Sequence, residues 1–236
     1  MPPGEQEGGL GQEFFTPGSS SFTEFLAAHR PALLSTRRVL PDGVRAEGVP
    51  HGTTVLTLTY GDGVLIAGDR RATAGNLIAQ RDLEKVHPLA TMIRGNLGQA
   101  VQGLAVVPLL AGYGPAAPEG ARGRIFGFDI AGGRYEKSGF PAEGSGSPYA
   151  RGALKKLFRP GLTRREAALA ALQALYAAAD DDSATGGPDL ARRIFPVVSV
   201  ITEDGFERLS EAETEQLSRE MVERRHARPD GPNAAV

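Results

Sequence analysis

Two short runs of β-forming residues flank the turn Gly61-Asp62-Gly63. Apolar and β-branched residues on both sides of such a turn predict a β-hairpin. In an antiparallel pair centred near position 62, residues 69–71 return alongside residues 53–55. Any fold that contains this hairpin therefore brings Asp69 close to Thr53.

Thr53 becomes a reactive group if the bond between Gly52 and Thr53 is cut. A free α-amine titrates at about 7.7–8.0, so it can accept the Oγ proton of the same residue, usually through a water. The β-methyl group restricts the side-chain torsion, and Gly52 permits the tight bend that self-attack requires. This interpretation makes residues 1–52 a propeptide that autocleavage removes. The alternative is that Gly-Thr-Thr merely starts a strand.

Lys85 lies as far beyond Asp69 as Asp69 lies beyond Thr53, because 69 − 53 = 16 and 85 − 69 = 16. A lysine near the nucleophile would stabilise the alkoxide as it forms, and the carboxylate would keep that lysine charged and oriented. The alternative is an exposed lysine, which is the commoner case.

Further candidates lie in three turns. Arg71 and Thr73 would line a substrate cleft, where an extended peptide could pair with their backbone. Ser145 precedes an expected helix, where N–H groups collect. Asp182 follows a helix C-terminus, where acidic residues oppose the helix dipole, so it is expected to serve with Thr185 elsewhere. The alternatives are a plain turn, a helix cap and a solvated acidic loop.

Composition excludes several classes of site. With no cysteine, disulfides and thiolate metal sites are impossible, and only four histidines occur without an HExxH pattern. We therefore predict no metal and no cofactor. The net charge of −2 gives no basic field for nucleic acid. An acidic N-terminus without an apolar segment, and no long apolar run, predict no signal peptide, no membrane span and a cytoplasmic location.

The remaining pattern predicts an α+β fold. Residues 1–20 are expected to be disordered, a Ser21 capping box opens a short helix, and residues 36–52 form a linker; a docking arm is the alternative role for this leader. Strands and helices then follow as layered antiparallel sheets and helices. Strands are expected at 76–87 (carrying Lys85), 106–113, 124–129, 135–138, 194–201 and 206–209, with helical spacing at 89–101 and a turn at Gly132-Gly133. Helices are expected at 147–158, 163–179 and 210–225. Their predicted N-terminal caps are Ser147, a capping box of Thr163 and Glu166, and Ser210.

These residues together resemble the β-subunit family of the proteasome in its actinobacterial form. The resemblance runs from Thr53 to about Glu223. Its motifs are Gly52-Thr53-Thr54, Ala67-Gly68-Asp69-Arg70-Arg71-Ala72-Thr73, Arg94-Gly95-Asn96-Leu97, Gly144-Ser145-Gly146-Ser147 and the segment 180–189.

The resemblance implies an N-terminal-nucleophile hydrolase with a four-layer αββα sandwich. Residues 1–52 would be the propeptide of a zymogen, and residues 53–236 the catalytic domain. Thr53 would be nucleophile and base, Asp69 and Lys85 would tune it, and a supporting set would hold the amine and the catalytic water. That set is Ser145, Asp182 and Thr185. Family members form seven-membered β rings stacked on α subunits and fed by an ATPase ring that delivers unfolded proteins.

The sequence departs from the family pattern between Pro88 and Leu89. Two strands and a helix that the family carries there are missing. The missing part includes the glycine whose N–H forms the oxyanion hole, and loss of one such donor typically costs about 10²–10³ in rate. It also includes much of the pocket for the P1 side chain. The leading hypothesis is a threonine endopeptidase of the bacterial 20S proteasome core. The alternatives are an inactive or assembly-only β-type subunit, and an amidase acting on small molecules.

Overall fold

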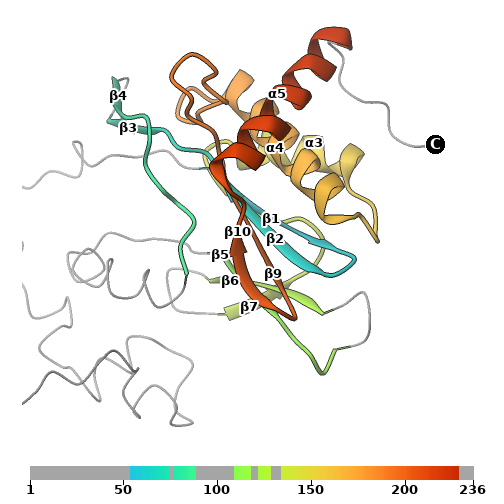
Figure 1. Ribbon diagram of the computed structural model, residues 1–236. Coiled ribbons are helices and arrows are strands. Elements are labelled where there is room, and N and C mark those ends of the chain that lie inside the picture. The colour runs from blue at the N-terminus through green and yellow to red at the C-terminus, as the bar shows by residue number, and fades with distance from the viewer. Residues whose placement is uncertain (1–53, 75–76, 89–108, 118–121, 129–133, 229–236) are drawn as a thin grey trace, which may run out of the picture.

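The computed structural model describes residues 54–74, 77–88, 109–117, 122–128 and 134–228 (Figure 1). Along the chain, eight strands are followed by two helices, two further strands and a final helix among the described residues. The strands are β1 (Thr54–Tyr60), β2 (Gly63–Gly68), β3 (Ala72–Ala74), β4 (Leu77–Gln80), β5 (Leu109–Tyr113), β6 (Gly123–Phe128), β7 (Arg134–Lys137), β8 (Ala142–Gly144), β9 (Val197–Thr202) and β10 (Gly205–Arg208). The helices are α3 (Ser147–Leu157), α4 (Arg164–Asp181) and α5 (Glu211–Ala227).

The predicted hairpin is present as β1 and β2. Tyr60 pairs with Gly63 across a two-residue turn, and Val55 pairs with Gly68. One step further along, the Asp69 N–H donates to the Thr54 carbonyl at 3.1 Å. The carboxylate therefore returns to the start of β1, as the sequence predicted.

Five strands form the sheet that carries this hairpin, in the order β10-β9-β2-β1-β8. All four pairings are antiparallel. The strand expected from Ile194 begins only at Val197, because Ile194 instead makes an isolated bridge with Asp189. The three-residue strand β8, which the sequence analysis did not predict, pairs Gly144 with Thr54.

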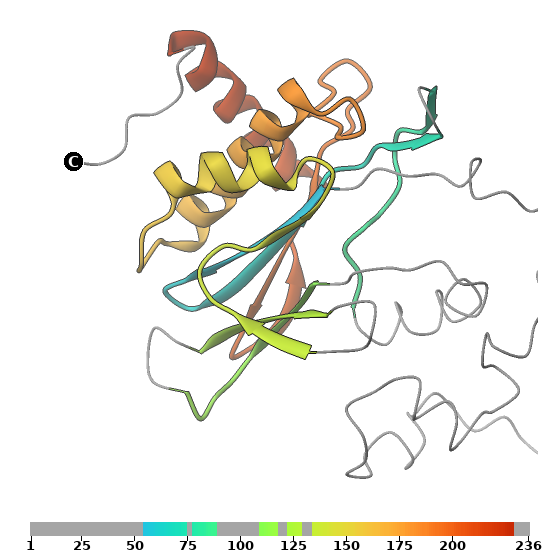
Figure 2. The same ribbon diagram turned by 180° about the vertical axis from the view of Figure 1, so that it is seen from behind.

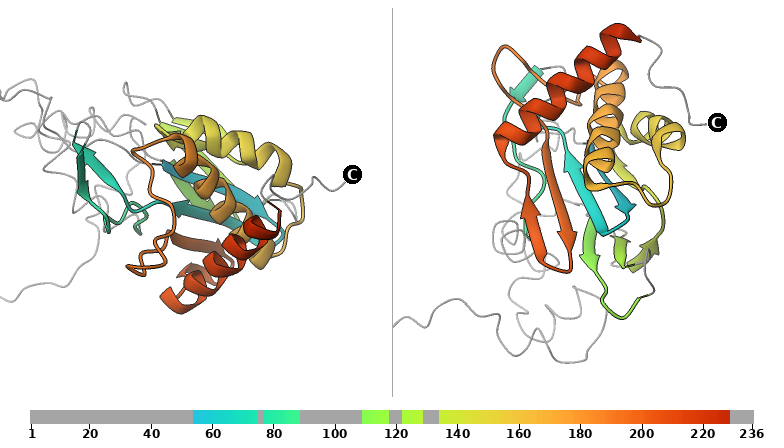
Figure 3. Two further views of the ribbon diagram at one scale, coloured as in Figure 1. Left: turned by 90° about the horizontal axis from the view of Figure 1, so that it is seen from above. Right: turned by 45° about the vertical axis from the view of Figure 1, so that its right-hand side comes forward.

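Three helices cover one face of this sheet (Figure 2). Helix α4 begins with the predicted capping box of Thr163 and Glu166 and buries mostly alanine against β1 and β2. Small side chains let the helix approach the sheet closely, and Leu172 and Leu175 fill the remaining space. Ser210 caps α5 as predicted, and α5 packs on α4 (Figure 3).

A second sheet, in the order β5-β6-β7, lies against the opposite face. Gly123 on β6 permits the close approach of the two sheets. A Cβ atom at Gly123 would lie 2.2 Å from the carbonyl oxygen of Gly63 on β2. The described residues thus form a helix layer and two sheet layers.

The hairpin of β3 and β4 extends away from these layers (Figure 1). Leu77 at the start of β4 is 75% exposed. The strand expected across 76–87 ends at Gln80, so the prediction that Lys85 lies on a strand is wrong. Lys85 lies in a segment without regular secondary structure, and its side chain is held by Asp69 and the Arg71 carbonyl.

The prediction that Ser147 caps α3 is also wrong. Gly146 is the N-cap residue, and no side chain caps the helix. Ser147 instead accepts a hydrogen bond from Arg151 at 3.1 Å. Several expectations lie outside the described residues: those for residues 1–52, Thr53 and 89–101, the turn at Gly132-Gly133, and the fourth layer of the sandwich.

Candidate active site

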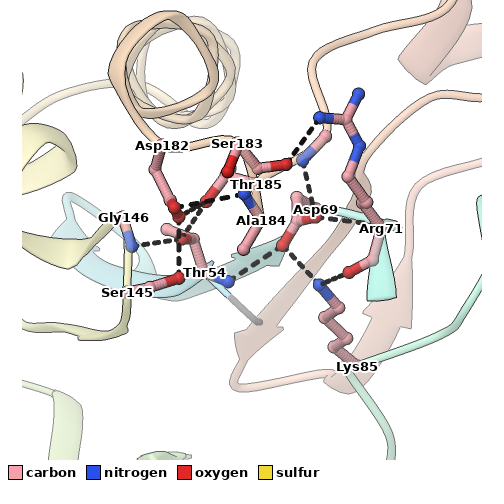
Figure 4. Close-up of polar contacts among 11 residues, drawn as sticks. Thr54, Asp69, Arg71, Lys85, Ser145, Gly146, Asp182, Ser183, Ala184 and Thr185 are labelled. Atoms are coloured by element: carbon pink, nitrogen blue, oxygen red, sulfur yellow. Dashed lines mark hydrogen bonds and ion pairs between the residues drawn. The ribbon is translucent and has the colours of Figure 1, made fainter. Parts of the chain in front are cut away.

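The Asp69 carboxylate is the centre of the first of two polar clusters (Figure 4). It is fully buried and accepts four hydrogen bonds. Its Oδ1 accepts from the Thr54 N–H at 2.9 Å and from Lys85 Nζ at 2.6 Å. Its Oδ2 accepts from the N–H groups of Arg71 at 2.8 Å and Gly186 at 2.9 Å. A buried carboxylate with this many donors is held in one orientation.

Lys85 reaches Asp69 from an adjacent segment. Its side chain is 4% exposed, and Nζ also donates to the Arg71 carbonyl at 2.5 Å. Burial lowers the pKa of Lys85, and Asp69 only partly offsets this by its charge and hydrogen bond. An ammonium group has three donors, so the two bonds leave one for a further acceptor.

Arg71 joins this cluster to the loop after α4. Its guanidinium donates to the Ser183 carbonyl at 2.9 Å, and a cavity of about 30 Å³ lies beside Arg71 and Gly186. Thr73 is buried on β3. It does not line that cavity. The prediction that Arg71 and Thr73 together line a substrate cleft therefore remains a prediction.

Asp182 is the centre of the second cluster. Its Oδ2 accepts from Ser145 Oγ at 2.7 Å and from Thr185 Oγ1 at 2.5 Å, and its Oδ1 accepts from the Ala184 N–H at 3.1 Å. Partial burial opposes ionisation, but the Thr185 and Ser145 hydroxyls, the Ala184 N–H and the charge of Lys85 hold the pKa of Asp182 below its ordinary value.

Two elements bring the members of this cluster together. Helix α4 ends at Asp181, and its C-cap Asp182 turns the chain into the 183–186 loop. Strand β8 pairs with β1 and delivers Ser145 to the same position from the other side. Asp182 accepts from the Thr185 hydroxyl, while the role that the sequence analysis expected for these two residues stays a prediction.

Thr54 connects the two clusters. Its backbone N–H belongs to the Asp69 cluster, while its Oγ1 lies 2.6 Å from Thr185 Oγ1 and accepts from the Gly146 N–H at 3.1 Å (Figure 4). Sequence reasoning missed the hydroxyl of Thr54 and the N–H groups of Gly146 and Gly186. Backbone donors carry no side-chain signal, although the two glycines mark places where the chain approaches closely.

The structure therefore brings together most of the predicted site residues. They are Asp69, Arg71, Lys85, Ser145, Asp182 and Thr185. Thr53 and Gly52 lie outside the described residues, and their roles stay predictions. Among the described residues, no group of three or more His, Asp or Glu side chains could hold a metal ion. Nor does any helix in that part of the chain combine the length and apolarity needed to cross a membrane.

Comparison with known proteins decides the family. A family model described as proteasome subunit matches residues 49–105 and 89–189. The chain belongs to the proteasome subunit family. Its fold is accordingly the α+β, αββα arrangement of N-terminal-nucleophile hydrolases, of which the described residues show the helix layer and both sheets.

Several relatives of this proteasome-family chain are named as β subunits from actinobacteria. "Proteasome subunit beta 1" of Streptomyces avermitilis is 68% identical over 277 residues, covering 97% of this chain and 98% of the relative. "Proteasome subunit beta" of Streptomyces griseus subsp. griseus is 46% identical over 97% of both chains. "Proteasome subunit beta 2" of Thermomonospora curvata is 45% identical over 98% of both.

The alignment with the Streptomyces avermitilis relative is longer than this chain. It spans 277 positions, whereas the chain has 236 residues, so at least 277 − 236 = 41 positions hold a residue of the relative alone. The family model also matches in two overlapping segments, the second of which begins at residue 89. Neither finding places the additional positions along the chain, so the missing segment after Pro88 stays a prediction.

Proposed function

We propose that this chain is the catalytic β subunit of a bacterial 20S proteasome core, a threonine endopeptidase that degrades unfolded proteins to peptides. The observation that carries the proposal is the shared oxygen of Asp69. Oδ1 accepts both from Lys85 Nζ and from the N–H of Thr54, the residue to which Thr53 is joined. The Lys85 ammonium is thereby fixed beside the backbone nitrogen of Thr54, the atom to which Thr53 is bonded.

In this proposal autocleavage removes residues 1–52 and leaves 236 − 52 = 184 residues. In the processed chain, the free amine of Thr53 takes the proton from Thr53 Oγ, and Oγ bonds to the carbonyl carbon of the substrate peptide bond that is cleaved. The nitrogen of that substrate bond leaves with the proton. Water then hydrolyses the ester between Thr53 and the rest of the substrate, which frees Thr53 again. The ammonium of Lys85 stabilises the alkoxide, and Asp69 orients that ammonium.

The second cluster has a supporting role. Ser145, Asp182 and Thr185 would hold the amine and the catalytic water near Thr53. The lowered pKa of Asp182 keeps its carboxylate ionised at working pH, which suits a group that accepts hydrogen bonds from an ammonium or a water.

The assembly follows from the same proposal. The chain would form a homo-heptameric β ring that stacks on proteasome α subunits, with an ATPase ring that feeds it unfolded protein. A cytoplasmic location is part of this proposal and rests on the sequence alone.

The test is intact mass spectrometry of the chain co-expressed with its α partner. We expect the mass of residues 53–236, together with cleavage of a casein-like unfolded substrate by the assembled particle. A Thr53→Ala chain should keep residues 1–52 and be inactive, while Thr53→Ser should restore part of both processing and activity. Full peptidase activity in the Thr53→Ala particle would refute the proposal.

One observation favours the alternative of an inactive or assembly-only subunit. At least 41 aligned positions of a β-subunit relative have no counterpart here. The family resemblance implies that the segment missing after Pro88 carried the oxyanion donor. That alternative predicts a full-length mass inside a ring-sized particle that cleaves nothing. An active particle of ring size contradicts it.

A further inference from the structure

The Thr54 hydroxyl occupies a closed space between three elements. Thr54 and Thr185 are both fully buried, and their hydroxyl oxygens lie 2.6 Å apart. A Cβ atom added to Gly146 would lie 2.4 Å from Thr54 Oγ1 and 2.5 Å from Thr185 Oγ1. The start of β1, the turn before α3 and the loop after α4 therefore meet at this one hydroxyl.

The hydrogen bonds at this point have a fixed direction. Thr185 Oγ1 donates its single proton to Asp182 Oδ2, because an ionised carboxylate only accepts. Thr54 must then donate to Thr185. The Thr54 oxygen in turn accepts from the Gly146 N–H. One chain of donors thus runs from the Gly146 amide through two hydroxyls to Asp182, and such chains strengthen each of their bonds.

We infer that Thr54 is a positioning residue. Its hydroxyl fixes the side chains of Thr185 and Asp182 in position relative to the adjacent Thr53. The inference rests on the proposed function. Thr54 can do this because its backbone N–H is fixed to Asp69 at 2.9 Å while its side chain fixes the other cluster. Thr54 then links the Asp69 cluster to the Asp182 cluster, directly beside the proposed nucleophile Thr53.

The hydroxyl, and not the shape of the side chain, carries this role. Valine keeps the volume of threonine but offers a methyl group to the Gly146 N–H, which would lose its acceptor in a buried site. It also offers no proton to Thr185. Serine keeps the oxygen and its proton and loses only the methyl group.

Thr57 provides a matched control on the same strand. It is also fully buried, and its hydroxyl donates to the Pro141 carbonyl at 3.3 Å, away from both clusters. Thr57→Val therefore makes the same chemical change at the same burial without touching the site.

The experiment compares Thr54→Val, Thr54→Ser and Thr57→Val in particles assembled with the α partner, using a fluorogenic peptide. We expect Thr54→Val to lower kcat about tenfold or more with KM within about twofold. Thr54→Ser should retain kcat within about threefold, and Thr57→Val should match the wild type. A role in shape alone predicts the reverse order for the two Thr54 variants, and that order would overturn the inference.

A second readout needs no turnover. Amide hydrogen exchange across residues 182–187 should be faster in Thr54→Val than in Thr54→Ser or wild type, whether or not the particle is active. Equal exchange in all three overturns the positioning role. An inactive wild type, or an active Thr53→Ala particle, would instead overturn the proposed function, so the two failures are distinguishable. The melting temperature of each particle shows whether a variant folds.

Discussion

Lys85 and Asp69 form an ion pair that is almost completely removed from water, with Nζ 2.6 Å from Oδ1 and side-chain exposures of 4% and 0%. The pair is not isolated, because three backbone N–H groups also converge on the carboxylate. Buried ion pairs are weak sources of stability unless such additional bonds are present. Here they fix the orientation of a charge that the proposed mechanism uses.

Replacing Asp69 with asparagine should damage both stability and activity. Lys85 would lose the carboxylate that opposes the effect of burial on its charge, and breaking such a buried pair typically costs about 3–5 kcal/mol. We expect propeptide removal to fail or slow, and kcat to fall by about 10² or more. Intact mass and peptidase assays of the assembled particle measure both effects. Asp204→Asn, at an exposed turn, is the control and should leave both unchanged.

The lowered pKa of Lys85 predicts an alkaline limit to activity. As pH rises through that pKa, the ammonium loses its proton and no longer stabilises the alkoxide. Burial lowers this pKa from 10.5, so the loss of kcat with rising pH should already begin at a pH below 10.5. On the acid side, protonation of the Thr53 amine should limit activity at about pH 7.7–8.0 or below.

Lys85→Arg separates this limit from general alkaline unfolding. Arginine stays charged at every accessible pH, so any residual activity of the variant should lack the alkaline decline. A decline at the same pH in wild type and variant would show that another group is responsible. Particle integrity at each pH is checked by size-exclusion chromatography.

Short sequence patterns were sufficient to predict the β1–β2 hairpin and the starts of two helices. The β1–β2 hairpin follows from its turn and its apolar strands, and its register alone brings Asp69 to the start of β1. The helices that start after Thr163 and Ser210 follow from their side-chain caps. These elements are encoded within a few residues, so one sequence is enough to find them.

Contacts between distant segments could not be predicted this way. Gly146 meets Thr54 across 92 positions, and Gly186 meets Asp69 across 117. Strand β8 has only three residues and ends in glycine, so no periodic pattern reveals it. The second cluster was expected from the family resemblance, whereas the hydroxyl that joins it to the first became visible only in the structure.

Two glycines at one helix predict opposite effects of the same substitution. Gly146→Ala would place a Cβ 2.4 Å from Thr54 Oγ1 and 2.5 Å from Thr185 Oγ1, two buried hydroxyls that are held by hydrogen bonds. We expect a loss of about 1–3 kcal/mol in stability and reduced activity. Gly152, inside α3, has nothing within 4 Å of an added Cβ. Gly152→Ala should stabilise the chain by about 1 kcal/mol, because alanine favours the helix.

Thermal unfolding of the two glycine variants, with peptidase activity measured in parallel, checks this prediction. Gly146→Ala should unfold at a lower temperature than wild type and Gly152→Ala at a higher one. If Gly146→Ala unfolds at or above the wild-type temperature, the space around Gly146 is not limiting, and the contact between β1 and the turn before α3 is looser than the distances indicate.

Restoring the missing segment should raise activity. The relative from Streptomyces avermitilis has at least 277 − 236 = 41 aligned residues that this chain lacks. The family resemblance assigns the oxyanion donor to a segment missing between Pro88 and Leu89. Inserting that segment between Pro88 and Leu89 should therefore increase kcat by about 10²–10³, the usual contribution of one oxyanion donor. Peptide hydrolysis by particles with and without the insertion is the measurement.

The control is an insertion of equal length made of glycine and serine, which restores chain length without strands, helix or pocket. If the relative's segment raises kcat and the flexible one does not, the loss lies in specific groups and not in a strained connection after Pro88. Equal kcat for the uninserted chain and the restored chain would mean that this chain already has a donor elsewhere.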